Sequence, residues 1–127
     1  MGAMTFNERA AGLTNKVILL AMLPAGLAYI AYDYYGDGGR AVAAALTLYV
    51  MIGACRFFWD LRGYLWFWAV MLLIGTIHAA LVVEIPWSNG PYPVPILVIL
   101  FPATMLDFMT IYLVIRSVEA ILTQIDR

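Results

Sequence analysis

The dominant pattern along the chain is a series of long apolar runs separated by short polar, Gly-rich or Pro-rich links. Four runs stand out, at about residues 17–32, 41–55, 64–83 and 94–115. They are continuous, whereas the strands of a membrane barrel would alternate apolar and polar residues. Because lipid leaves no partner for unpaired backbone groups, continuous runs predict helices. We therefore expect an all-α membrane protein, a four-transmembrane-helix up-down bundle.

The first two runs are shorter than a bilayer requires. They hold 15 or 16 residues, or ~24 Å of helix, whereas a perpendicular span needs ~20 residues. We expect Lys16 and Arg56 to extend their charged ends out of the lipid, with local thinning of the bilayer. Lys16 and the apolar residues after it also resemble a signal peptide, and we interpret this segment as a retained anchor.

The composition indicates lipid as the solvent of this chain. Of the 127 residues, 65% are hydrophobic and 12% charged, whereas soluble domains are about half apolar and a quarter charged. So short a chain has too much surface to hide this excess. The net charge of −1, without a basic run, gives no indication of nucleic acid binding. We expect one integral membrane domain over residues 1–127, in contact with the bilayer.

The cations predict the orientation of the bundle. Six of the seven fall at one end of it, namely Arg9, Lys16, Arg56, Arg62, Arg116 and Arg127, and only Arg40 falls at the other. The positive-inside rule then places both termini in the cytoplasm, and we expect a bacterial inner membrane. The outer side receives Asp33, Asp37 and Glu84, together with a stiff Pro-rich loop over residues 84–95.

Both ends of the chain show amphipathic patterns. Thr5 and Glu8 have the spacing of a capping box. One face of the helix that follows would carry Phe6, Ala10, Leu13 and Val17, which suggests a helix at the membrane interface. Near the other end, a second apolar face lies opposite Glu119 and consists of Val118, Ile121, Leu122 and Ile125. Two interpretations fit this tail: it lies on the membrane surface, or it docks a partner.

The stretch RFFWDLRGYLWFW, residues 56–68, combines aromatic and charged side chains at the predicted inner boundary. Tryptophan and tyrosine favour this layer, so we interpret the stretch as an anchored hairpin turn. Asp60 is expected to pair with Arg56 or Arg62. A stacking site for a charged or aromatic head group is the alternative.

Asp107 is the first candidate functional residue, because it lies deep in the fourth run. A carboxylate there costs a few kcal/mol unless it is paired or neutral. Thr104 and Thr110 share its helical face, and Pro102 should kink the helix. These features predict a polar notch, which Tyr49 of the second run and Arg56 directly after that run are expected to line.

His78 is the second candidate, in the outer half of the third run. Gly75 and Ala79 beside it suggest close helix packing. Together with Asp33 and Glu84 it forms a predicted outer polar cluster that suits proton or cation binding. Counting residues from the helix ends puts His78 ~9 Å and Asp107 ~20 Å below the outer edge. We therefore expect no direct contact, with a ligand or water chain between the two.

Cysteine and small residues add little specific chemistry. Cys55 is the only cysteine and His78 the only histidine, so we predict no disulfide, metal site or cofactor. Small residues such as Ala45 and Gly53 recur at multiples of four residues, which places them on one helix face and allows close helix packing. Such faces are consistent with a homo-oligomer or with a partner in a membrane complex.

Three classes of function fit these residues. The first is a non-catalytic accessory or assembly subunit, or a binder of a lipophilic small molecule at Asp107, Thr104, Thr110, Tyr49 and Arg56. The second is an intramembrane acid/base enzyme, of isomerase or cyclase type, with Asp107 and His78 as catalytic groups. The third is a proton-coupled transporter or channel subunit, with these two residues as stations along the path.

Overall fold

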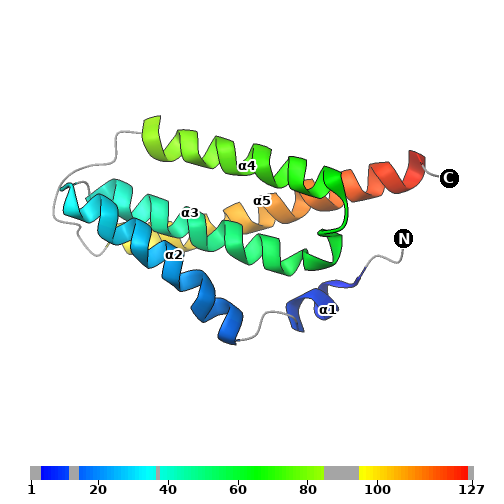
Figure 1. Cartoon of the computed structure of the whole chain (residues 1–127), viewed down its shortest axis with the longest axis horizontal. Coiled ribbons are helices and arrows are strands. Elements are labelled where there is room, and N and C mark those ends of the chain that lie inside the picture. Colours follow the sequence, from blue (N-terminus) through cyan, green and yellow to red (C-terminus); the bar gives the residue numbers. More distant parts are fainter. Residues whose placement is uncertain (1–3, 12–14, 37, 85–94, 126–127) are drawn as a thin grey trace.

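The computed structural model describes residues 4–11, 15–36, 38–84 and 95–125, and this part of the chain is helical with no strand. The helices are α1 (Phe6–Ala11), α2 (Asn15–Tyr34), α3 (Gly38–Phe57), α4 (Leu65–Glu84) and α5 (Pro95–Ile125), with a short 3₁₀ helix, η1 (Trp59–Leu61) (Figure 1). The all-α prediction is confirmed.

Three of these helices, α2, α3 and α4, are long and apolar enough to cross a membrane. Each has 20 residues, or ~30 Å of helix, which matches a bilayer core. The helices α2 and α3 extend past their apolar runs, taking in Lys16 and Arg56. The short spans and local thinning expected there are therefore unnecessary. A fourth span, over α5, stays a prediction.

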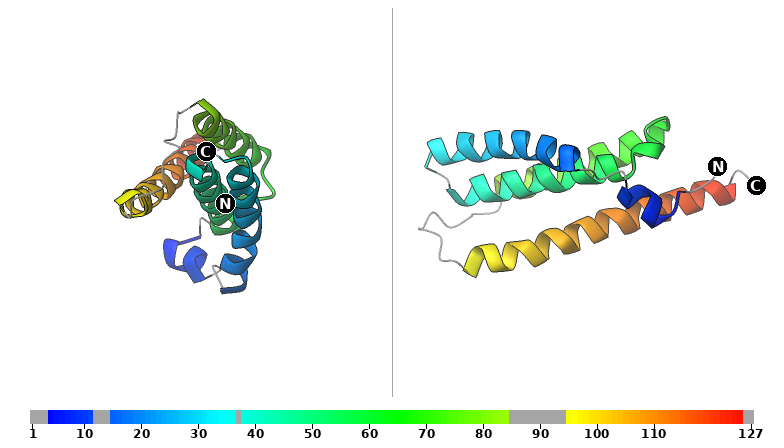
Figure 2. Two further views of the ribbon diagram at one scale, coloured as in Figure 1. Left: turned by 90° about the vertical axis from the view of Figure 1, so that its left-hand side faces the viewer. Right: turned by 90° about the horizontal axis from the view of Figure 1, so that it is seen from below.

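The helix α3 is the centre of the arrangement, since it packs along α2 and also contacts α4 and α5. Seen from the end of the molecule, the other long helices lie around α3 (Figure 2). The turn after α2 is closed by a hydrogen bond of 2.9 Å from the Gly36 amide to the Asp33 carbonyl. Gly36 has a φ of 76°, which a residue with a Cβ rarely adopts.

The first residue of α5 is Pro95, so the predicted Pro-rich loop over residues 84–95 is shorter in the structure, where Glu84 still belongs to α4. Proline suits the first position of a helix, because its missing N–H would be unpaired there. Residues 85–94 lie outside the described part of the chain. The helix α5 then continues through Pro102 for 31 residues in total.

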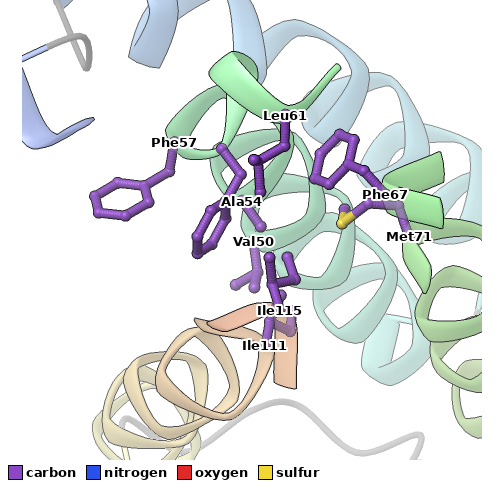
Figure 3. Close-up of a cluster of buried hydrophobic side chains, with 9 residues drawn as sticks. Val50, Ala54, Phe57, Leu61, Phe67, Met71, Ile111 and Ile115 are labelled. Atoms are coloured by element: carbon purple, nitrogen blue, oxygen red, sulfur yellow. The ribbon is translucent and has the colours of Figure 1, made fainter. Parts of the chain in front are cut away.

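The main core lies at the end of the molecule that carries η1, where α3, α4 and α5 converge (Figure 3). Its buried members are Val50, Ala54, Phe57, Phe58, Leu61, Phe67, Met71, Ile111 and Ile115. A smaller cluster of Ala43, Ala44 and Val82 lies toward the α2–α3 turn. Large apolar side chains cover the outside, such as Leu27, Leu72 and Leu106. Such a surface suits lipid rather than water.

The aromatic stretch 56–68 divides between these two environments. Phe57, Phe58 and Phe67 are buried in the core, whereas Trp59 and Trp68 are exposed. The predicted aromatic belt therefore fits Trp59 and Trp68, whereas Trp66 packs against the core and the phenylalanines hold the helices together. The belt interpretation had assigned no packing role to these rings.

Arg40, at the opposite end of the molecule, holds the last turn of α4. Its Nε donates to the Val82 carbonyl at 3.0 Å and its Nη2 to the Val83 carbonyl at 3.1 Å. The last four carbonyls of a helix have no hydrogen-bond partner within the helix. A cation at this end is also stabilised by the negative end of the helix dipole. Arg40 therefore joins the start of α3 to the end of α4.

We expect Arg40→Gln to lower the free energy of unfolding by about 1–2 kcal/mol, because two charge-assisted hydrogen bonds are lost. Hydrogen exchange of the protein in detergent should show faster exchange in the last turns of α4. Arg40→Lys serves as the control, since it keeps the charge but not the two-pronged geometry, and an intermediate effect is expected. Unchanged exchange in Arg40→Gln would contradict this role.

Candidate functional site

The two candidate residues of the apolar runs contact each other directly. The Nε2 atom of His78 lies 2.9 Å from Oδ1 and 3.0 Å from Oδ2 of Asp107, so the pair joins α4 to α5. The side chains are 16% and 30% exposed, respectively. The prediction that His78 and Asp107 do not touch was wrong.

The error has a geometric cause. Depth was counted from the end of the third run and the start of the fourth, as if both lay at the same level. His78 is six residues from Glu84, and Asp107 is twelve from Pro95. If the two helix axes are aligned, the side chains can meet only when the first residue of α5 lies ~9 Å beyond the last residue of α4 along that common axis. Hydropathy does not encode that offset.

The hydrogen bonds fix the number of protons on the pair. The Nδ1 atom of His78 lies 2.8 Å from the carbonyl oxygen of Ile74. A carbonyl only accepts, so Nδ1 carries a hydrogen. The bond between Nε2 and Asp107 needs a second proton, which resides on the ring or on the carboxyl group. The pair is net neutral in both forms, imidazolium with carboxylate or imidazole with carboxylic acid.

This neutrality explains how an acid can reside in an apolar segment. An unpaired carboxylate would cost a few kcal/mol there, whereas a hydrogen-bonded neutral pair avoids most of that cost. Both ring nitrogens of His78 are engaged. The oxygens of Asp107 retain further acceptor lone pairs, since a carboxylate has about four such sites. Any additional polar group would therefore bind to Asp107 rather than to His78.

The other residues predicted for the notch are arranged differently. Arg56 does not pair with Asp107. Its guanidinium carbon lies 5.9 Å from the centre of the Trp59 ring. The Thr110 hydroxyl donates to the Leu106 carbonyl of its own helix at 2.9 Å. Thr104 is half-buried and Tyr49 is exposed. Of the predicted site residues, the structure thus joins Asp107 to His78, and a ligand-binding role for the set stays a prediction.

The predicted outer polar cluster is also rearranged. Asp33 and Glu84 are exposed near the ends of α2 and α4, whereas the ring nitrogens of His78 bond to Ile74 and Asp107. His78 therefore belongs with Asp107. Of the two small residues beside it, Gly75 packs toward α3, where a Cβ would lie 3.4 Å from Cε of Met51. Ala79 is exposed, so it takes no part in this packing.

A second group of charges, which the sequence analysis missed, lies at the η1 end. The side chain of Arg9 in α1 is only 1% exposed, and its Nη2 lies 2.8 Å from Oδ2 of Asp60 and 3.6 Å from Oε1 of Glu119. Its guanidinium carbon is 4.7 Å from the centre of the Phe58 ring. Arg116 donates to Glu119 at 2.6 Å. This ionic cluster connects α1, η1 and α5.

Two predictions are corrected by this ionic cluster. Asp60 pairs with Arg9 and not with Arg56 or Arg62. Glu119 is buried, whereas Ile121 and Ile125, assigned to the apolar face opposite it, are exposed. The spacing Ile111–Ile115–Glu119 held the missing signal, because four-residue steps place Glu119 on the face that carries two core residues.

The short helix α1 is positioned by a capping box, as predicted. The Thr5 amide donates to Oε2 of Glu8 at 2.7 Å, and the Glu8 amide donates to the Thr5 hydroxyl at 3.4 Å. The bond from the Thr5 amide, and then the bond of 2.9 Å that the Thr5 hydroxyl donates to the same Oε2 atom, lower the pKa of Glu8. The rest of the predicted interfacial face is different: the Phe6 ring packs on Phe57 and Tyr112, and Leu13 lies outside the described residues.

The chain was compared with known proteins. No family model matches it, and no curated protein or solved structure is significantly similar to it. The apolar helices are compatible with a membrane protein. The His78–Asp107 pair is the feature of the described residues that bears on a more specific function.

Proposed function

We propose that this chain is a small, non-catalytic accessory membrane protein that binds a lipophilic ligand at Asp107. The observation that carries this proposal is the 30% exposure of the Asp107 side chain on a surface of apolar residues such as Leu106. A polar group that faces lipid favours any molecule that covers and hydrogen-bonds it. The ligand would have an apolar body and a hydroxyl or amide donor.

The proposed membrane topology has four spans, α2 to α5, with both termini in the cytoplasm of a bacterial cell and the chain in the inner membrane. Two observations support it. The helix α1, η1 and the last turns of α5 lie at one end of the molecule (Figures 1 and 2). Four cations lie in or directly beside these segments, namely Arg9, Arg56, Arg62 and Arg116, and an excess of cations marks the cytoplasmic side.

Native mass spectrometry of the protein in mild detergent tests ligand binding. The wild type should carry a bound lipophilic molecule, and His78→Leu with Asp107→Leu should lose it. The double variant removes both polar partners together, so neither is left unpaired. Ser117→Ala is the control, because its hydroxyl donates to the Leu113 carbonyl within α5 and it lies outside the predicted site. Equal occupancy in the double variant, or an empty wild type, would overturn the proposal. A bound protein subunit instead would identify an assembly role.

An acid/base enzyme is the second candidate, favoured by the proton that the pair shares. The Ile74 carbonyl orients the ring of His78, and Asp107 would exchange the proton with an apolar substrate. Asp107→Asn should then abolish turnover in a folded protein; retained turnover would exclude this role. Proton-coupled transport stays a prediction, in which His78 and Asp107 would act as one station rather than two, because they contact each other.

A further inference from the structure

The turn between α3 and α4 arranges two arginines around one tryptophan. The guanidinium carbon of Arg56 lies 5.9 Å from the centre of the Trp59 ring, and that of Arg62 lies 5.3 Å from it. Trp59 is 40% exposed. Both cations are therefore held near the same accessible indole, at the distance typical of cation–π contacts.

The acid in this turn does not neutralise these arginines. Asp60 directs its carboxylate to Arg9, at 2.8 Å. In the part of the chain that the structure describes, neither Arg56 nor Arg62 has a carboxylate within ion-pair distance. Because Arg9 pairs with Asp60, the turn presents two guanidinium groups that form no ion pair with any acidic side chain of the described residues.

The turn is also fixed in place before any ligand arrives. Nη1 of Arg62 donates to the Trp59 carbonyl at 3.0 Å, and Nε1 of Trp68 donates to the Arg62 carbonyl at 2.7 Å. Beneath it, Phe58 and Leu61 are buried in the core. A preorganised site loses less conformational entropy on binding than a flexible one.

The position of the turn indicates the ligand. It joins two helices that are long enough to cross a membrane, so it lies at the level of the lipid head groups, where indole rings also accumulate. Guanidinium groups bind phosphate through paired hydrogen bonds. We propose that Arg56, Arg62 and Trp59 form a binding site for the phosphate of an anionic membrane lipid, a site separate from the His78–Asp107 pair.

The test uses the full chain in vesicles of phosphatidylcholine with a minority of phosphatidylglycerol. Brominated acyl chains quench nearby tryptophans, and the difference between wild type and Trp59→Phe isolates the signal of Trp59. Brominated phosphatidylglycerol should quench Trp59 more than brominated phosphatidylcholine does. Arg56→Gln and Arg62→Gln should each weaken this preference about fivefold, the expected effect of one arginine near an anionic surface.

Lys16→Gln is the matched control, since Lys16 is an exposed cation outside this turn, and it should keep the preference. Equal quenching by the two lipids in the wild type, or an equal loss in Lys16→Gln, would overturn the site in favour of general surface charge. A second arm adds inorganic phosphate to the protein in detergent with bound phosphatidylglycerol. Retention of the lipid supports the proposal, whereas saturable displacement would identify free phosphate as the ligand and overturn the lipid assignment.

Discussion

Replacing His78 with alanine is expected to lower the free energy of unfolding by about 2–4 kcal/mol, because it leaves the Asp107 carboxyl group without its partner in an apolar segment. The histidine supplies the positive charge, or accepts the acid proton, in the 2.9 Å bond. Without it, Asp107 must remain charged at a high cost or take up a proton from water. The loss is measurable by denaturant unfolding in detergent micelles.

Two further variants distinguish the loss of the His78–Asp107 interaction from the loss of the volume of the imidazole ring. Asp107→Asn should cost less than about 1 kcal/mol, since its amide can donate to Nε2 while Nδ1 keeps its bond to Ile74. His78→Ala with Asp107→Ala should be more stable than the sum of the single losses predicts, because no charge remains unpaired. Additive losses in this cycle would show that the two side chains do not stabilise each other.

The helices could be predicted from the sequence because backbone pairing in lipid has so few solutions. The ends of α2 and α3 could not, since hydropathy marks the apolar part of a helix and not its hydrogen bonding. Lys16 and Arg56 therefore lie inside helices that the apolar runs alone would end earlier.

Of the two residues of the candidate site, Asp107 could be predicted as a site residue, but its pairing with His78 could not. A lone acid in an apolar run identifies Asp107 on energetic grounds, and the need for a partner follows. The choice of His78 depends on how far α5 is displaced along α4, which neither helix encodes by itself. Arg9 was missed for another reason: charged residues in an amphipathic end were assigned to water, although a buried arginine with acidic partners is equally consistent with the pattern.

The second large effect is expected at Arg9. Arg9→Met should lower the free energy of unfolding by about 3 kcal/mol, since it removes the buried cation that pairs with the partly buried Asp60. Glu119 keeps Arg116 at 2.6 Å, so the unpaired charge falls mainly on Asp60. Among the described residues, Nε and Nη1 of Arg9 and Oδ1 of Asp60 have no hydrogen-bond partner. This incomplete pairing keeps the expected loss below the maximum for a buried pair.

The loss should be local as well as global, because Arg9 and Phe6 hold the six-residue α1 in place. Hydrogen exchange and limited proteolysis should therefore increase first in α1. Arg9→Met combined with Asp60→Leu should recover much of the stability, since an apolar pair replaces the ionic one without leaving a charge behind. Glu8→Gln, which weakens only the capping box, is the control, and a smaller loss is expected. If Arg9→Met leaves both the exchange of α1 and the unfolding midpoint unchanged, the ionic cluster does not hold α1 against η1 and α5.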